Sequence, residues 1–482
     1  MNGDTFAPVM MNVQQAAKVL EAEWSGSNPF FNAVSTDSRT IRAGSLFVAL
    51  SGERFDGHRF IPDAIDKGAV AAMISDEAID IPETFTMSDF SWLRVRDPRL
   101  ALGKLAAAWR KRFDLPLVAV TGSNGKTTVK EMLASILRQH AGCDRVLATS
   151  GNLNNDIGVP LTLLQINASH NYAVIEMGMN HSGEIAYLSG LASPTVAVIT
   201  NAGSAHIAHF GKTDAIAAAK GEIFEGLDES GVAVINVDDH FAPLWRQLAG
   251  KRQIVDFGMT HTASVSARRL QGVTENGWLL TLPEGQAELT LQVPGRHSVY
   301  NALAAAAAAY AAGVGLPAIA VGLGSYRGTH GRLQTMAGLH HSVLIDDTYN
   351  ANPESMQAAL AVLGDTKGKK ILVMGDMGEL GVAAAVYHRE IGQLARAAKV
   401  DTLLAHGELS RHAAEAFGLD RGGQYFTNLD ELMACLAGQL DADVTVLVKG
   451  SRIMRMERVV EKIAATEKIM DRNIVLQGQN EH

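Results

Sequence analysis

Short apolar segments recur along most of the chain, and the stretches between them are long enough for one helix each. This alternation predicts strands joined by crossover helices, and therefore parallel sheets. In the middle of the chain, apolar strands are predicted at residues 115–120, 172–176, 195–200 and 232–236. A second series follows Gly331, with strands predicted at residues 342–345, 370–374, 402–405 and 444–448. The pattern thus predicts two parallel α/β sheets in one chain.

The segment before residue 98 mixes shorter strands with helices. Residues 45–50 are almost wholly apolar, as in a buried strand, and residues 60–67 carry a helical pattern that ends before Gly68. Pro98 suits the first turn of a helix predicted over residues 98–112, because an N–H at that position would have no partner within the helix. We therefore expect a boundary between two folded parts just before Pro98.

Two stretches depart from the alternation. Residues 263–293 are more polar and alternate at a period of two, which predicts antiparallel strands with a turn at residues 275–277. Residues 302–323 are almost wholly apolar and long enough to span a bilayer. They are mostly alanine, however, and Gly313 and Pro317 interrupt them. We predict a buried helix, a turn and a second helix there, and no membrane partner.

The composition fits a packed enzyme. Of the 482 residues, 47% are apolar, which argues against a disordered chain. The net charge of −9 argues against a nucleic-acid partner. The two cysteines, Cys143 and Cys435, are too few and too far apart for a disulfide framework or a zinc site. The N-terminus has no basic segment followed by an apolar one, so we expect a cytoplasmic protein, and we expect a monomer.

The most specific motif follows the first central strand. Residues 120–129 read V-T-G-S-N-G-K-T-T-V and precede a helical pattern. A glycine loop between a strand and a helix cradles a polyphosphate with backbone N–H groups and the helix N-terminus. Val120 stands where the usual motif begins with glycine, and Gly122 takes over that role. Lys126 would reach the outer phosphates, and the Thr127 hydroxyl would bind Mg²⁺. The residues predicted to bind ATP are Gly122, Ser123, Asn124, Gly125, Lys126, Thr127 and Thr128.

Together these patterns predict an α/β protein with three domains. Residues 1–97 would form a small α/β domain, and residues 98–328 a central P-loop domain around a parallel sheet. Residues 329–482 would form a Rossmann-like α/β domain. No G-x-G-x-x-G motif follows the first strand of that third domain, so we expect no dinucleotide site there.

Polar residues follow the central strands at their carboxyl ends, where α/β sheets place ligands. Glu176 ends one strand, and a carboxylate there can hold Mg²⁺, although a capping or surface role is equally open. His206 follows the next strand, and Lys220 lies in an alanine-rich helix. Taken alone, both are more often structural or solvated residues. A desolvated lysine near a metal can, however, react with CO₂ to give a carbamate, which is an oxygen ligand.

The order of these candidates along the chain carries further information. It matches the order found in Mur ligases, with residues 122–128, Glu176, His206, Lys220 and a G-R-H-x-x-x-N-A segment at residues 295–302. The chain resembles this family of ATP-dependent, amide-forming enzymes over essentially its whole length. The resemblance implies that Lys126 contacts the ATP phosphates and that Glu176 and His206 help to hold Mg²⁺. It also implies a carbamylated Lys220 and a contact of Asn301 with adenine.

The resemblance extends to the third domain. Arg332 would approach the γ-phosphate when the domain closes and stabilise the charge that develops during phosphoryl transfer. Asp347, which ends a strand, would contact the ribose of ATP. The catalytic residues implied in this way are Lys126, His206, Lys220 and Arg332. The chain departs from the family pattern at Ser298, where an asparagine is usual.

The outer segments bear on the substrates. The first domain resembles the part of two family members that grips the uridine diphosphate of a muramoyl precursor. Hydroxyls, backbone N–H groups and an arginine suit a pyrophosphate, and the loop supplies them with Ser35, Thr36, Asp37, Ser38 and Arg39. Further substrate contacts are expected from Asn154, Asn155, Asn350 and Asn352. Their segments resemble the member that joins D-alanyl-D-alanine to a UDP-N-acetylmuramoyl tripeptide, so both partners would be small molecules.

Three alternatives stay open. The ligase that acts one step earlier adds a diamino acid and often carries an Asp-Asn-Pro-Arg motif, which this chain lacks. Folylpolyglutamate synthase shares the ATPase core but has no separate domain like residues 1–97. A non-catalytic nucleotide-binding regulator would leave Glu176, His206, Lys220 and Arg332 unexplained. ATP turnover that depends on two organic substrates would separate these classes.

Overall fold

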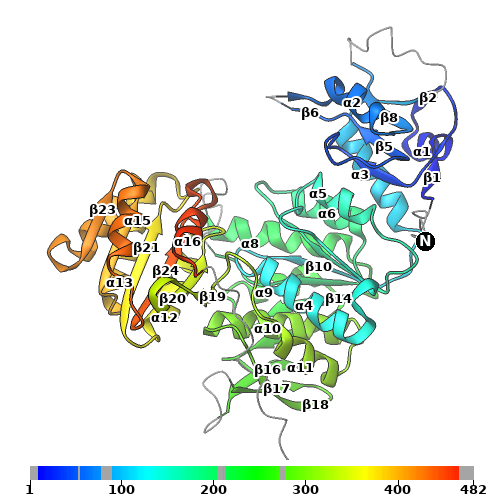
Figure 1. Ribbon diagram of the computed structural model, residues 1–482. Coiled ribbons are helices and arrows are strands. Elements are labelled where there is room, and N and C mark those ends of the chain that lie inside the picture. Colours follow the sequence, from blue (N-terminus) through cyan, green and yellow to red (C-terminus); the bar gives the residue numbers. More distant parts are fainter. Residues whose placement is uncertain are drawn as a thin grey trace, which may run out of the picture. The chain divides into compact units, whose positions relative to one another are not determined.

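The computed structural model describes residues 9–52, 55–77, 90–203, 210, 212–270 and 277–465. The chain divides into two compact units. In Figure 1, most of the first unit is coloured from blue to green and most of the second from yellow to red. Unit 1 comprises Met1–Ala202, Asp214–Leu289 and Asn301–Ser325. Unit 2 comprises Gly203–Thr213, Thr290–Tyr300 and Tyr326–His482.

Unit 1 begins with a five-stranded sheet in the order β2-β9-β8-β5-β4. Its strands are β2 (Glu23–Ser25), β4 (Ala33–Ser35), β5 (Ser45–Val48), β8 (Ala71–Ser75) and β9 (Ser91–Val95). All neighbouring pairs are parallel except β2 with β9. The predicted strand at residues 45–50 is confirmed by β5, and the helix predicted at residues 60–67 by α2.

Short elements complete this first part of unit 1. The helices are α1 (Val13–Leu20), η1 (Gly57–Phe60) and α2 (Ile61–Asp66). The small pairs are β1 (Met11–Asn12) with β3 (Phe30–Phe31) and β6 (Ser51–Gly52) with β7 (Phe55–Asp56). The next helix is α3 (Pro98–Arg110), and the side chain of Asp97 caps it by accepting from the N–H groups of Arg99 and Leu100. The helix start predicted at Pro98 is therefore confirmed.

The second sheet of unit 1 has nine strands, in the order β11-β12-β10-β13-β14-β15-β16-β17-β18. They are β10 (Leu117–Thr121), β11 (Val146–Ala148), β12 (Tyr172–Glu176), β13 (Val196–Ile199), β14 (Val232–Asn236), β15 (Gln253–Gly258), β16 (Val265–Arg269), β17 (Gly277–Leu282) and β18 (Gly285–Thr290). Strands β11 to β16 run parallel, and β17 pairs antiparallel with β16. The predicted parallel sheet and the antiparallel strands beyond it are both confirmed. The turn expected at residues 275–277 lies largely outside the described residues.

Helices connect and cover these strands. They are α4 (Lys126–Ala141), η3 (Cys143–Arg145), α5 (Gly158–Leu163), α6 (Glu184–Ala192), α8 (Thr213–Gly221), η4 (Glu222–Gly226), α9 (Ala242–Ala249), α10 (Arg296–Ala311) and α11 (Leu316–Ser325). The apolar stretch at residues 302–323 forms two helices with Gly313 at a φ of +85° between them, as predicted. In the part of the chain that the structure describes, no helix combines the length and the apolar character needed to cross a membrane.

Unit 2 is built on a six-stranded sheet in the order β19-β20-β24-β21-β22-β23. The strands are β19 (Gln334–Ala337), β20 (Val343–Asp347), β21 (Lys369–Gly375), β22 (Thr402–His406), β23 (Gly423–Phe426) and β24 (Val444–Lys449). All pairs are parallel except β19 with β20. The four strands predicted after Gly331 are therefore present.

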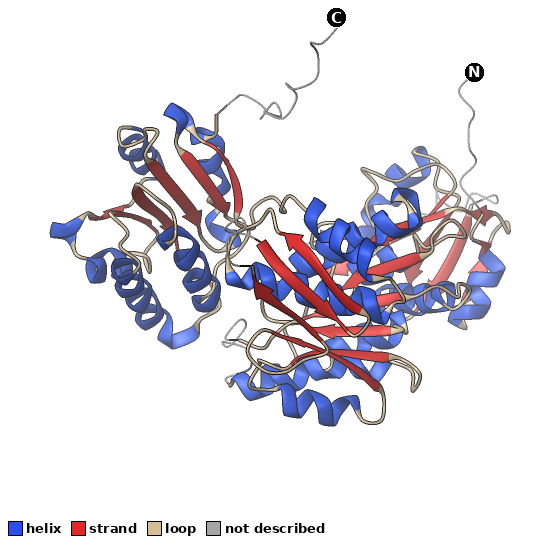
Figure 2. Ribbon diagram, turned by 90° about the horizontal axis from the view of Figure 1, so that it is seen from below, coloured by secondary structure: helices blue, strands red, loops and turns tan. Residues whose placement is uncertain are grey.

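Apolar cores lie on both faces of this sheet, and Figure 2 shows helices on either side of its strands. The helices are α12 (Pro353–Gly364), α13 (Ala384–Ala397), α14 (Arg411–Phe417), α15 (Leu429–Ala437) and α16 (Glu457–Ile463), with the short 3₁₀ turns η5 (Leu339–His341), η6 (Gly381–Ala383), η7 (Leu419–Arg421) and η8 (Arg452–Met454). One core includes Met356, Ile391 and Phe417, and the other includes Leu432 and Val460. The predicted α/β class is confirmed, while the boundaries at residues 97 and 328 stay predictions.

Candidate active site

Two glycines shape the loop between β10 and α4. Gly122 has a φ of +150° and Gly125 a φ of +83°, conformations that L side chains rarely adopt. A Cβ atom on Gly122 would lie 1.8 Å from the Oγ1 of Thr200, and one on Gly125 would lie 2.3 Å from the Oδ1 of Asn301. A residue with a side chain would therefore not fit at either position. The close approach also places Asn301 beside the loop, and its contact with adenine stays a prediction.

The loop is fastened to the end of β13. The backbone N–H groups of Ser123 and Asn124 donate to the backbone and side-chain oxygens of Asn201, at 3.0 and 2.9 Å. In return, the Thr200 hydroxyl donates to the Asn124 carbonyl at 2.6 Å. No role was predicted for Thr200 and Asn201, although Thr200 ends a predicted strand and Asn201 follows it. Their place at the carboxyl end of the strand next to β10 was the signal that could have identified them.

Lys126 begins α4. Its ammonium donates to the carbonyls of Gly122, at 2.7 Å, and Ser123, at 3.4 Å. The lysine therefore lies over the glycine loop, where its charge faces the position that a polyphosphate takes in such loops. Thr128 follows on the first turn and is half-buried.

Glu176 ends β12 beside this helix and is almost fully buried. One carboxylate oxygen accepts from the Thr127 hydroxyl at 2.8 Å, and the other accepts from the Asn154 amide at 2.8 Å. The backbone N–H of Glu176 donates to the Thr149 hydroxyl at 2.9 Å. Three predicted site residues, distant in sequence, therefore meet at one carboxylate. Thr149 was not predicted.

The asparagines at residues 154 and 155 have different surroundings. Asn154 belongs to the network of Glu176, and its backbone carbonyl accepts from the N–H of Gly178 at 2.8 Å. The side chain of Asn155 accepts from the N–H groups of Ile157 and Gly158, at 3.3 and 2.8 Å, and so shapes the turn into α5. A substrate contact by either residue stays a prediction.

Lys220 lies near the end of α8, with 1% of its surface exposed. Burial lowers the pKa of its ammonium well below the ordinary range, and the positive charge of Lys126 lowers it further. Burial therefore favours the neutral amine over the ammonium at this position. His206, the other residue predicted near the metal, lies outside the described residues.

In unit 2, Asp347 ends β20 in a buried position. Its carboxylate accepts from the backbone N–H of Leu333 at 3.1 Å and pairs with the ammonium of Lys449 at 2.6 Å. Burial raises the pKa of Asp347, and the charge of Lys449 opposes that rise. Lys449 also donates to the backbone carbonyl of Asn350 at 2.8 Å. The aspartate thus fixes the backbone next to Arg332.

Arg332 stacks on an aromatic ring. Its guanidinium carbon lies 4.0 Å from the centre of the Tyr349 ring, a cation–π geometry that favours one orientation of the side chain. Tyr349 was not predicted. Asn350 accepts from the backbone N–H of Ala351, and Asn352 caps α12 in a mutual arrangement with Ser355. The capping role of Asn352 is local, and its contact with a substrate stays a prediction.

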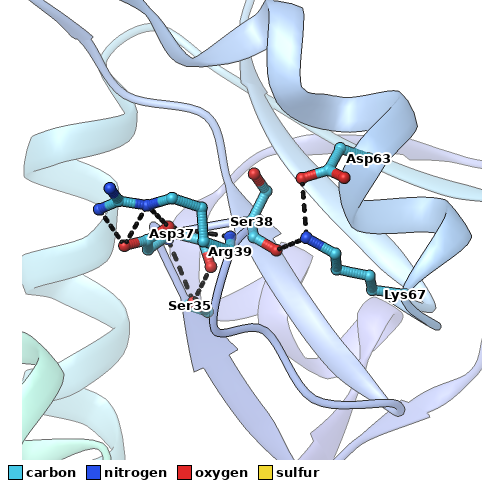
Figure 3. Close-up of polar contacts among 6 residues, drawn as sticks. All are labelled: Ser35, Asp37, Ser38, Arg39, Asp63 and Lys67. Atoms are coloured by element: carbon cyan, nitrogen blue, oxygen red, sulfur yellow. Dashed lines mark hydrogen bonds and ion pairs between the residues drawn. The ribbon is translucent and has the colours of Figure 1, made fainter.

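The Ser35–Arg39 loop of unit 1 is shown in Figure 3. The Arg39 guanidinium pairs with Asp37 through both Nε and Nη2, and the pair lowers the pKa of Asp37 to about 2. Ser35 Oγ accepts from the N–H of Asp37 and donates to its carbonyl, each at 3.1 Å. Lys67 of the neighbouring helix end donates to the Ser38 carbonyl at 3.0 Å. The arginine side chain is 85% exposed and can therefore receive an anion.

Comparison with known protein families agrees with this geometry. Three family descriptions match the chain, namely "Mur ligase family, catalytic domain" at residues 31–110, "Mur ligase middle domain" at residues 120–309 and "Mur ligase, glutamate ligase domain" at residues 331–452. The UDP-N-acetylmuramoyl-tripeptide–D-alanyl-D-alanine ligase of Escherichia coli K12 is 41% identical over 460 residues, which cover 94% of this chain and 98% of that relative. The chain belongs to the Mur ligase family. It is therefore an ATP-dependent, amide-forming ligase, as predicted.

Solved structures of Mur ligases share the fold. The crystal structure of MurF from Acinetobacter baumannii is 37% identical and superposes with a TM-score of 0.85, covering 94% of this chain and 98% of that one. MurF ligase from Thermotoga maritima, crystallised in complex with ADP, is 29% identical with a TM-score of 0.77 and covers 89% and 96%. The likeness extends over both compact units of the chain.

Proposed function

We propose that this Mur ligase joins D-alanyl-D-alanine to a UDP-N-acetylmuramoyl tripeptide and converts ATP to ADP and phosphate. The observation that carries the proposal is the network in which Thr127 of the phosphate-binding helix and Asn154 meet at the Glu176 carboxylate. It is supported by the 41% identity to the Escherichia coli enzyme of that name. ATP use fits a cytoplasmic enzyme, and we propose a monomer.

The reaction has two steps. An oxygen of the tripeptide carboxylate attacks the γ-phosphorus of ATP, the bond to the bridging oxygen breaks, and ADP leaves. The resulting acyl phosphate is then attacked at its carbonyl carbon by the amine of D-alanyl-D-alanine. A tetrahedral intermediate forms, the amine loses a proton, and phosphate departs as the amide is made. Water must be excluded throughout, because it would hydrolyse the acyl phosphate.

The chain's own residues handle the negative charge. Lys126 turns from the loop carbonyls to the β- and γ-phosphates, while the backbone N–H groups at the start of α4 hold their oxygens. Arg332 supplies a further cation to the transferred group. Its stacking on Tyr349 already restricts the side chain, so less conformational freedom is lost when it binds the phosphate. Asn301 contacts the adenine, and Asp347 contacts the ribose.

The residues at Glu176 fit a magnesium ion. The buried carboxylate accepts hydrogen bonds from uncharged groups, and the Thr127 hydroxyl next to it is a second hard oxygen donor. Mg²⁺ in such sites takes one or two protein oxygens, with substrate phosphates and water completing the octahedron. When bound, the ion would neutralise charge on the β- and γ-phosphates. Thr127 and Glu176 would hold it, together with His206.

Lys220 is proposed to carry a carbamate. A neutral amine attacks the carbon of CO₂, an N–C bond forms, and a proton leaves to water, so that a carboxylate replaces the amine. The position next to Lys126 favours this exchange, because burial disfavours the ammonium form and the new anion lies near a cation. The carbamate would provide a further oxygen ligand for Mg²⁺ close to the phosphate-binding loop.

The outer segments bind the organic substrates in this proposal. The Ser35–Arg39 loop takes the pyrophosphate of the nucleotide sugar, for which Arg39 offers an exposed guanidinium. Asn154 and Asn155 bind the muramoyl peptide, while Asn350 and Asn352 lie in the domain that receives D-alanyl-D-alanine.

Phosphate release tests the proposal directly. ATP and the UDP-muramoyl tripeptide are combined with D-alanyl-D-alanine, meso-diaminopimelate, L-lysine or no acceptor, and the series is repeated with the dipeptide nucleotide. We expect release only with the tripeptide plus D-alanyl-D-alanine. Turnover of the dipeptide nucleotide with a diamino acid would instead identify the preceding ligase. Turnover with a folate and glutamate, in a parallel assay, would identify folylpolyglutamate synthase.

A further inference from the structure

Glu222 has no role in the proposed chemistry, yet its carboxylate is one of the most heavily bonded in unit 1. It begins η4, two residues after Lys220. One oxygen accepts from the Ser182 hydroxyl at 2.8 Å and from the backbone N–H of Gly183 at 2.9 Å. The other accepts from the same N–H at 2.9 Å and from that of Ala186 at 3.3 Å.

These donors lie where α6 begins. Gly183 is the N-cap of α6, has a φ of +88°, and brings no side chain that could satisfy the free N–H groups of the first turn. Glu222 satisfies two of them from a distant part of the chain. Gly183 lies seven positions after Glu176, so the same contact secures the segment that leaves the carboxylate at the end of β12. Glu184 holds the middle of that segment by accepting from the N–H groups of Asn180 and His181.

Two further contacts place η4 against the same helix, one near its start and one at its end. The Ser189 hydroxyl donates to the Ile223 carbonyl at 2.6 Å. Gly226 lies so close to α6 that a Cβ atom on it would come within 2.2 Å of the Ser189 backbone. The 3₁₀ helix is therefore held against α6 at both ends. Because α8 runs directly into η4, this arrangement leaves the Lys220 segment little freedom to shift.

We propose that Glu222 is a positioning residue that sets the place of Lys220 relative to the segment leaving Glu176. The carboxylate connects the two parts of the chain that bring these groups to the phosphate-binding loop. The inference rests on the proposed function of Lys220, since a positioned lysine matters only if it serves the reaction. Glu222 itself touches neither substrate nor metal in this proposal.

Three variants of the full-length protein test it. Glu222→Ala removes the acceptors, and Glu222→Gln keeps one carbonyl oxygen for Ser182 and Gly183. Glu225→Ala is the matched control, because Glu225 lies in the same 3₁₀ helix, is exposed and loses the same charge. Carbamate at Lys220 is measured by ¹³C NMR in ¹³C-bicarbonate, with Lys220→Ala identifying the signal. The value of kcat, the KM for ATP and the thermal midpoint are measured alongside.

We expect Glu222→Ala to lower kcat by about tenfold to a hundredfold, the scale of a small displacement near a reacting group. The carbamate signal should fall with it, the KM for ATP should change little, and Glu222→Gln should lie between the wild type and Glu222→Ala. Glu225→Ala should match the wild type in all readouts. If Glu222→Ala lowered only the thermal midpoint, the residue would be a helix cap and the proposal would be wrong.

A double-mutant cycle tests the role of Glu222 independently of whether Lys220 carries a carbamate. In a Lys220→Ala background, removing Glu222 should cost nothing further in kcat, because the residue acts through Lys220. An equal loss in both backgrounds would overturn the inference. Absence of a ¹³C signal from the wild type would instead overturn the carbamate alone, and the cycle would still decide the role of Glu222.

Discussion

Three lysines of unit 1 show how the surroundings of a residue decide what its side chain can do. Lys126 lies over the loop carbonyls and in the proposed function turns to a phosphate. Lys130, one turn further along α4, is fully buried but pairs with Glu131 and donates to the Thr149 carbonyl, each at 2.7 Å. Lys220 is equally buried, and burial lowers the pKa of its ammonium. In the proposed function, Lys220 is the one of the three that reacts with CO₂.

Loss of the Lys220 amine should be repairable by a small anion. Lys220→Ala leaves a cavity where a carbamate would lie, and acetate or formate could place a carboxylate there. We expect kcat to fall by about a hundredfold or more and to recover in part as the carboxylate concentration rises. Chloride at equal ionic strength is the control. Failure of every short-chain carboxylate to restore turnover would count against the carbamate.

His297 should make the stability of the protein depend on pH. Burial lowers its pKa from 6.5 to about 4, and the charge of Lys449 adds to the effect. Above pH 6.5 the imidazole is neutral in both the folded and the unfolded chain. As the pH falls from 6.5 to 4, only the unfolded chain takes up the proton, so the free energy of unfolding decreases, by about 3 kcal/mol in all.

Two measurements check this prediction. NMR of the imidazole should give a pKa of about 4 for the resonance that His297→Gln removes. Urea unfolding should show a weaker loss of stability between pH 6.5 and 4 in that variant than in the wild type. Equal pH dependence in the two proteins would show that His297 is not the group responsible.

At the scale of elements, a close helix contact holds the phosphate-binding helix in place. Gly322 of α11 lies against α4, and a Cβ atom on it would come within 2.4 Å of the Cα of Ile136. The Ser135 hydroxyl donates to the Gly322 carbonyl at 2.8 Å. Both backbones can approach so closely only because the glycine has no side chain. The position of α4, and with it that of Lys126, therefore depends on a residue far along the chain.

A pair of glycine substitutions separates this packing effect from helix propensity. Gly322→Ala should destabilise the protein by about 1–3 kcal/mol, because the helices must move apart. Gly190→Ala, within α6, should stabilise it by about 0.5–1 kcal/mol, since nothing lies within 4 Å of the added Cβ atom. Thermal unfolding followed by circular dichroism measures both. A tolerated alanine at residue 322 would mean that the contact between α4 and α11 is loose.

At the scale of the whole molecule, the substrates are predicted to use separate parts of the chain. Arg39 lies in the first part of unit 1 and Lys126 in the nine-stranded part. Removing a charge-assisted hydrogen bond to phosphate costs about 1.5–3 kcal/mol. Arg39→Ala should therefore raise the KM for the nucleotide sugar by about tenfold to a hundredfold. The KM for ATP should not change.

Matched variants complete this experiment. Lys126→Ala should abolish ATP turnover and leave binding of the nucleotide sugar intact, as measured by calorimetry. Arg42→Ala, an exposed arginine three residues after Arg39, is the control for loss of charge and should behave as the wild type. A parallel rise of both KM values in Arg39→Ala would contradict the division of the substrates between the two parts.

The sequence determined the elements and the identity of most candidate residues. The alternation of apolar strands and helices predicted both parallel sheets, because each buried strand needs an apolar run and each crossover needs a helix. The glycine loop before Lys126 predicted the phosphate site, since its requirements are local to about ten residues.

Only the tertiary structure decided which residues meet. Thr200 and Asn201 hold the glycine loop, Tyr349 supports Arg332, and Glu222 caps α6 from beyond α8. Each of these contacts joins segments that lie far apart in the sequence or have no repeating pattern. The local spacing of residues therefore does not predict them. Burial is likewise a property of the folded molecule. It lowers the pKa of Lys220, and the sequence alone could equally have placed that lysine in water.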